Sequence, residues 1–112
     1  MKIVYSEQFQ AELCCITGRY TAEGRELGRS FVQTVESICV EIAADPLRWR
    51  IFDGRVRRCL VPRFPYIIYY LVEDDLLYFG ALLHSARHPE AAALQLQALV
   101  TRLAPATRSL VA

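Results

Sequence analysis

The chain has 112 residues, enough for one domain with a single buried core. Hydrophobic residues make up 54% of it and charged residues 22%, which excludes a disordered protein. The longest apolar runs, residues 67–72 and 76–83, are much shorter than the roughly 20 residues of a membrane-spanning helix. No apolar stretch typical of a signal peptide follows Lys2. We therefore expect a cytoplasmic protein with no membrane association.

The net charge is only +1, but the charges are unevenly distributed. Residues 1–47 carry four basic and seven acidic residues, a balance of −3, whereas residues 48–63 carry six arginines and one aspartate, a balance of +5. This concentration of basic side chains indicates a surface for an anionic partner. The arginines of this basic segment are Arg48, Arg50, Arg55, Arg57, Arg58 and Arg63.

The first 47 residues predict a strand and two helices. Lys2–Tyr5 is β-branched and aromatic, which favours a strand, and Ser6 is a good N-cap for the first helix. That helix ends in the cluster at residues 21–24, and the second ends near Asp45, because a residue before proline avoids helical geometry. The apolar stripes at helical spacing are Phe9, Leu13, Ile16 and Tyr20, then Leu27, Phe31, Val35, Ile38 and Ile42. Two such helices joined by a short turn form an antiparallel hairpin.

From residue 48 onward the apolar period changes to two, which predicts strands. The strand-like runs are residues 56–61, 66–72 and 76–84, with a weaker run at 49–52. Turn residues between them make consecutive strands antiparallel neighbours. The last run is apolar on both faces, as expected for a central strand that is covered on both sides.

After the last strand, Pro89 and Glu90 suit the first turn of a C-terminal helix. Residues 105–112 are expected to form a flexible tail after a single domain of residues 1–104. The predicted fold class is α+β. It comprises an N-terminal strand, an antiparallel helical hairpin packed on a mainly antiparallel sheet of about four strands, and a short C-terminal helix.

The cysteines and histidines do not predict a metal site. The four cysteines, at positions 14, 15, 39 and 59, lack zinc or redox spacing, and we interpret them as reduced thiols packed like small hydrophobic side chains. His84 and His88 are four residues apart, but Pro89 argues against the helix that a metal pair would need. We therefore expect neither a metal nor another cofactor.

Two local patterns resemble those of the RelE/ParE superfamily, the small toxins of type II toxin–antitoxin systems. They are the turn Arg-Phe-Pro-Tyr at residues 63–66 and the ending His-x-x-Arg-x-Pro at residues 84–89. The element order is also similar, and the likeness covers residues 2–100. We place the chain closer to ParE-like members. The resemblance implies a toxin neutralised by a co-encoded antitoxin, existing as a homodimer or a toxin–antitoxin hetero-oligomer.

The resemblance also implies one of two modes of action. RelE-type members cut messenger RNA in the ribosome, whereas ParE-type members poison DNA gyrase. Metal-free RNA cleavage needs a cation at the phosphate and groups that transfer protons. The candidate catalytic residues are Arg58, Arg63, His84, Arg87 and His88. The candidate residues for binding a target or phosphate are Arg55, Arg57, Arg58, Arg63 and Arg87.

The nuclease constellation is weak in this sequence. The only lysine is Lys2, and no tyrosine follows Tyr78, so the C-terminal tyrosine of some nuclease members is missing. Arginine is a poor general base because it stays protonated, which leaves only a histidine for proton transfer. We therefore favour gyrase inhibition. The alternatives are a ribosome-dependent messenger-RNA endoribonuclease and a non-toxic relative that keeps only antitoxin binding.

Structural roles for the same residues compete with these functional ones. Strand alternation places Arg57 and Arg58 on opposite faces, so that one of them faces the helices. Single arginines on strands are more often solvated or stacked on rings, and His84 is more often a hydrogen-bonded structural residue. The strand tyrosines could stack bases, but such residues are more often core and cross-strand packing.

Overall fold

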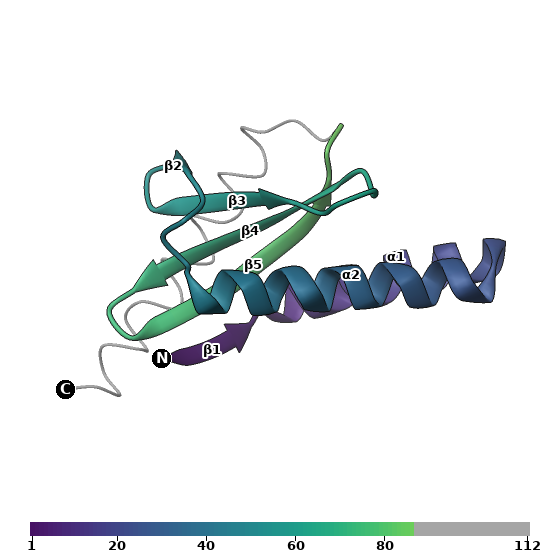
Figure 1. The fold of residues 1–112 in the computed structure, drawn as a ribbon, viewed down its shortest axis with the longest axis horizontal. Coiled ribbons are helices and arrows are strands. Elements are labelled where there is room, and N and C mark those ends of the chain that lie inside the picture. Colours follow the sequence, from purple (N-terminus) through teal and green to yellow (C-terminus); the bar gives the residue numbers. More distant parts are fainter. Residues whose placement is uncertain (87–112) are drawn as a thin grey trace.

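The computed structural model describes residues 1–86, which form two helices packed on one face of a five-stranded sheet (Figure 1). The elements are β1 (Lys2–Tyr5), α1 (Glu7–Glu23), α2 (Arg25–Ala44), β2 (Ile51–Asp53), β3 (Val56–Leu60), β4 (Tyr66–Glu73) and β5 (Leu76–His84). The predicted α+β class, opening strand and helical hairpin are confirmed. The predicted C-terminal helix and tail lie outside the described residues. Neither described helix combines the length and apolar character needed to cross a membrane.

The strands lie in the order β1-β5-β4-β3-β2, and consecutive strands from β2 to β5 pair antiparallel, as predicted. The predicted N-terminal strand, β1, joins the predicted four strands parallel to β5, so that the sheet has five strands. The weak strand predicted at residues 49–52 forms at Ile51–Asp53. β5 lies between β1 and β4, and its residues 76–83 are all buried, so the prediction of a central covered strand is confirmed.

The helical hairpin buries most of its two predicted stripes against the sheet. The Ser6 hydroxyl accepts a hydrogen bond of 2.9 Å from the Phe9 N–H and begins α1 as its N-cap. The buried stripe residues are Phe9, Ile16, Phe31, Val35, Ile38 and Ile42. Leu27 is exposed because the turn between the helices projects beyond the sheet (Figure 1).

A β-bulge in β5 determines which side chains face the helices. Tyr70 pairs with Phe79 and Tyr69 pairs with Ala81, so that Gly80 has no partner in β4. The extra residue reverses the alternation along β5. Phe79 and Leu82 consequently both face the helical hairpin, although they are three residues apart.

Ser6 and Glu12 provide hydrogen-bond partners for the backbone of β5 beyond the end of β1. The Ser6 N–H donates to the Phe79 carbonyl at 3.0 Å, and the Ser6 hydroxyl donates to the Gly80 carbonyl at 2.8 Å. The Leu82 N–H donates to a carboxylate oxygen of Glu12 at 3.1 Å. Because buried backbone groups are costly without partners, these bonds substitute for a longer β1.

The cysteines fall into two pairs with different surroundings. Cys39 and Cys59 are buried, as predicted for thiols packed as small hydrophobic groups, and burial raises the pKa of Cys39 to about 12 and that of Cys59 to about 11. The same prediction is wrong for Cys14 and Cys15, which are exposed on α1, because the face of this helix that packs on the core carries Phe9, Leu13 and Ile16 and leaves both cysteines outside it.

The first prediction concerns the close approach of the two helices. A β-carbon at Gly28 would overlap the Thr21 hydroxyl and lie 3.1 Å from Thr21 Cα, whereas a β-carbon at Gly18 would meet nothing within 4 Å. Gly28→Ala should therefore lower the free energy of unfolding by about 1–3 kcal/mol. The matched control, Gly18→Ala, should raise it by about 0.5–1 kcal/mol through helix propensity. Urea unfolding measures both, and equal stability of the two variants would contradict the observed packing.

The second prediction concerns thiol reactivity. In folded protein at about pH 8, iodoacetamide should modify Cys14 and Cys15 but not Cys39 or Cys59, because buried thiols with raised pKa form little thiolate. Intact mass after a short reaction should show two additions, and the same reaction in denaturant should show four. Rapid modification of either buried thiol in the folded state would show that the core opens.

Candidate functional site

The two adjacent arginines of β3 lie on opposite faces of the sheet, as predicted, and the structure decides which is which. Arg57 lies on the helix side, where its guanidinium donates to the Trp49 carbonyl at 2.6 Å and to the Leu47 carbonyl at 3.4 Å. Arg58 lies on the opposite face, where its guanidinium carbon is 4.5 Å from the centre of the Phe52 ring. Arg57 is therefore a structural residue of β3 that supports the loop after α2.

This loop has a second support. The Tyr70 hydroxyl donates to the Pro46 carbonyl at 2.7 Å, and burial raises the pKa of Tyr70 to about 12 although the nearby Arg57 opposes the increase. The bonds from Arg57 and from the Tyr70 hydroxyl both tie carbonyl groups of this loop to the sheet. The side chains at residues 47–50 are thus presented on a fixed backbone.

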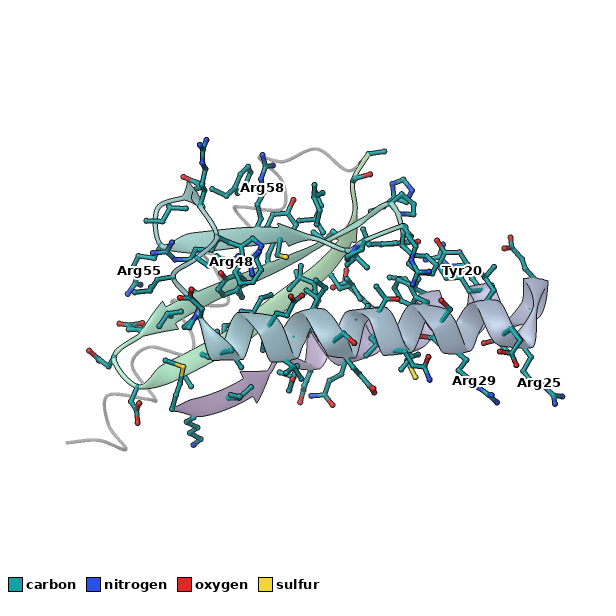
Figure 2. All side chains as sticks on the ribbon, in the orientation of Figure 1. Tyr20, Arg25, Arg29, Arg48, Arg55 and Arg58 are labelled. Carbon is teal, nitrogen blue, oxygen red and sulfur yellow. The ribbon has the colours of Figure 1, made fainter. Side chains whose placement is uncertain are left out.

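A groove lies between this loop, the second half of α2 and the outer edge of the sheet. Its volume is about 630 Å³. The cations that line it are Arg48, Arg50 and Arg58, the main apolar groups are Ile38, Trp49, Ile51, Phe52 and Leu60, and Glu41 is its carboxylate. We call this feature the basic groove. Figure 2 shows Arg48 and Arg58 beside β3, far from Arg25 and Arg29 on α2.

The basic groove combines charge with exposed apolar surface. Leu60 is 68% exposed and Ile51 is 55% exposed, and both are among the large hydrophobic residues that the fold leaves uncovered. The Arg48 guanidinium carbon lies 4.9 Å from the centre of the Trp49 ring, so that the cation stacks on the indole at the side of the groove. Exposed apolar residues rimmed by cations are typical of a binding surface for another macromolecule.

Two other predicted binding arginines are engaged elsewhere. Arg55 lies in the β2–β3 turn and forms an ion pair of 2.9 Å with Glu73. Arg63 lies in the β3–β4 turn with a positive φ of 68°, and its guanidinium donates to the Thr34 hydroxyl of α2 at 3.4 Å. These turns are at opposite ends of β3, so the structure does not bring the two residues together.

His84 ends β5 on the helix side of the sheet. Its Nδ1 accepts a hydrogen bond of 3.0 Å from the Ala86 N–H, and its ring meets Tyr66 edge-on at 5.2 Å between centroids. Because His84 shares the face of its partner Tyr66, it lies on the opposite face from Arg58. Arg87 and His88 lie outside the described residues.

The strand tyrosines are packing residues, as the sequence favoured. All four are buried, so none offers an open ring face for a nucleic-acid base. They are Tyr66, Tyr69, Tyr70 and Tyr78. Arg48, Arg50 and Leu60 line the basic groove but were not among the predicted site residues, although Arg48 and Arg50 belong to the basic segment. The run of arginines flanking Trp49 and an apolar residue at an exposed position of β3 were the available signals.

The model of the family described as the ParE toxin of the type II toxin–antitoxin system parDE matches residues 3–89. The chain belongs to this family. A solved structure titled "Chromosomal ParDE TA system from P. aeruginosa" shares the fold with a TM-score of 0.66 at 18% sequence identity. The alignment covers 75% of this chain and 95% of that one. No curated protein matches by sequence. The resemblance to ParE-like toxins, which the patterns at residues 63–66 and 84–89 predicted, is therefore confirmed for this ParE-family chain.

The third prediction tests the structural role assigned to Arg57. Arg57→Ala leaves the half-buried Trp49 carbonyl without its charged donor and should lower the free energy of unfolding by about 1.5–3 kcal/mol. Arg55→Ala removes an ion pair whose arginine is half exposed and should cost at most about 1 kcal/mol. Urea unfolding of the two variants gives the comparison. If the Arg57→Ala protein were as stable as the Arg55→Ala protein, the structural role of Arg57 would be contradicted. Its guanidinium would then be available to bind a ligand.

Proposed function

We propose that this ParE-family protein arrests bacterial growth in the cytoplasm by binding DNA gyrase directly, and that a co-encoded antitoxin neutralises it. The family supports this proposal, because ParE-type members poison gyrase. The basic groove supports it independently, because a rigid surface that combines cations with exposed apolar side chains suits contact with another protein.

The candidate catalytic residues that the structure describes do not lie together. This observation is the reason why we propose a binding mode and not catalysis. RNA cleavage requires a cation and a proton-transfer group within about one hydrogen bond of the same phosphate. Among the described residues, Arg58 and His84 lie on opposite faces of the sheet, and Arg63 contacts α2 in a turn. This arrangement favours inhibition by contact over a nuclease reaction.

The fourth prediction follows from this choice. After tightly controlled induction in bacteria, DNA synthesis should fall before protein synthesis, and pulse-labelling of both measures the order. The purified protein should also inhibit supercoiling by gyrase in the absence of ribosomes. Arg58→Glu should weaken this inhibition because it reverses a charge of the basic groove, whereas Arg29→Glu, on the remote part of α2, should not (Figure 2).

The nuclease alternative makes the opposite prediction for the histidines. A His84→Ala, His88→Ala double variant should remain toxic under the proposed mode, because neither imidazole takes part in it. Loss of toxicity together with an early fall in protein synthesis would instead assign messenger-RNA cleavage. Unchanged DNA and protein synthesis after induction would indicate a non-toxic relative and would contradict both modes.

A further inference from the structure

β1 forms the edge of the sheet that lies opposite the basic groove (Figure 1). Within residues 1–86 its one strand partner is β5, so the other side of β1 is open. The backbone N–H groups of Lys2 and Ser6 donate to carbonyls at or next to β5, at 2.7 Å and 3.0 Å. Because backbone groups alternate along a strand, the N–H and C=O groups of Ile3 and Tyr5 point to the open side.

The same edge leaves a row of large apolar side chains in solvent. The Tyr5 ring stacks on the Phe79 ring at 4.9 Å between centroids, which places Tyr5 on the helix side of the sheet. Alternation places Met1 and Ile3 on that side as well. Met1 is 56% exposed, Ile3 43% and Tyr5 42%. An edge strand with an uncovered apolar row is a template for pairing with another strand, which monomeric proteins usually avoid.

The ends of this edge are already satisfied. The Gln10 side-chain nitrogen donates to the Tyr5 carbonyl at 3.0 Å, and the Met1 nitrogen lies 3.5 Å from a carboxylate oxygen of Asp75. Within residues 1–86, the outward backbone groups that remain are the Met1 C=O, the Ile3 N–H and C=O, and the Tyr5 N–H. Donors and acceptors are therefore arranged symmetrically about Ile3.

We propose that two copies of the chain pair through β1, antiparallel and around a two-fold axis at Ile3. The N–H and C=O of Ile3 bond to the same groups of Ile3 in the second copy, as in a hydrogen-bonded antiparallel pair. The Tyr5 N–H of each copy donates to the Met1 carbonyl of the other. On the helix side, Tyr5 covers the second copy's Met1, and the two Ile3 side chains meet. Every remaining group of the edge thus finds a partner, and this self-complementarity identifies a second copy as the occupant.

Charge and chain length both agree with this occupant. The one cation of β1, Lys2, lies on the other face of the strand, and the two-fold axis places it beside Val4 of the second copy instead of beside a like charge. The net charge of each chain is only +1. A foreign strand longer than β1 would have to displace Gln10 from the Tyr5 carbonyl, so it matches this edge less well.

The pairing would join the two sheets into one and would leave a basic groove at each outer end, because β1 and β2 are the two edges of the sheet. The inference therefore does not depend on what the basic groove binds. One pair of short strands buries less surface than the roughly 1,200 Å² of a stable interface, so we expect a weak, concentration-dependent dimer.

The first test is sedimentation velocity of the full chain, with no tag before Met1, from about 1 µM to about 300 µM. The sedimentation coefficient should rise from that of a monomer to that of a dimer. Ile3→Lys places like charges directly opposite each other and should weaken dimerisation about tenfold or more. The matched control is Ile51→Lys, the same change at a 55%-exposed position of the opposite edge strand, which should leave dimerisation unchanged. Ile3→Val should retain the dimer, and circular dichroism checks that each variant is folded.

The second test is amide hydrogen exchange, followed by NMR at the two ends of the same concentration range. The amides of Ile3 and Tyr5 should exchange about tenfold or more slowly in the concentrated sample. The Val4 amide, which points to β5, should be protected equally in both and is the internal control. This pattern of alternate residues is specific to pairing along β1, because an interface through side chains alone would not select Ile3 and Tyr5 over Val4.

Three outcomes would overturn the proposal. The chain could stay monomeric over the whole range. The dimer could persist in Ile3→Lys or be lost in Ile51→Lys, which would place the contact elsewhere. Dimerisation could also leave the exchange of the Ile3 and Tyr5 amides unchanged, which would exclude strand pairing. All of these measurements are made without gyrase, so a failure of the dimer and a failure of the proposed target are separate results.

Discussion

The Ser6 hydroxyl joins three elements of the fold at one buried point. It accepts from the Phe9 N–H at the start of α1 and donates to the Gly80 carbonyl in the centre of β5, while the Ser6 backbone continues β1. Gly80 is the bulged residue, so this contact fixes the point at which β5 reverses its alternation. If β5 continued without the bulge, Leu82 would face away from the helices and the core of the hairpin would lose it.

The bulge also positions the residues that a nuclease would have used. Because β5 reverses before its end, His84 faces the same side as the helices, while Arg58 on β3 faces away from them. The separation arises from the geometry of the sheet and not from the choice of residues. A basic, histidine-bearing sequence of this kind is therefore compatible with a surface that acts by binding.

The basic groove depends on residues that do not line it. Arg57 and the Tyr70 hydroxyl hold the carbonyls of the loop after α2, and this support lets the loop present Arg48 and Trp49 in a fixed arrangement. Of the two adjacent arginines, Arg57 thus supports the loop and Arg58 lines the basic groove. Strand alternation divides the pair in this way without any change in composition.

The sequence by itself determined the class of the fold, the helical hairpin, the order of the antiparallel strands and the central position of β5. These features follow from local periodicity, capping and turn residues, which act over a few positions. It did not determine that β1 joins β5, that Gly80 is bulged or that Arg57 rather than Arg58 faces the helices. Those outcomes depend on contacts between residues as far apart as Ser6 and Gly80, and only tertiary packing decides which face of an alternating strand is buried.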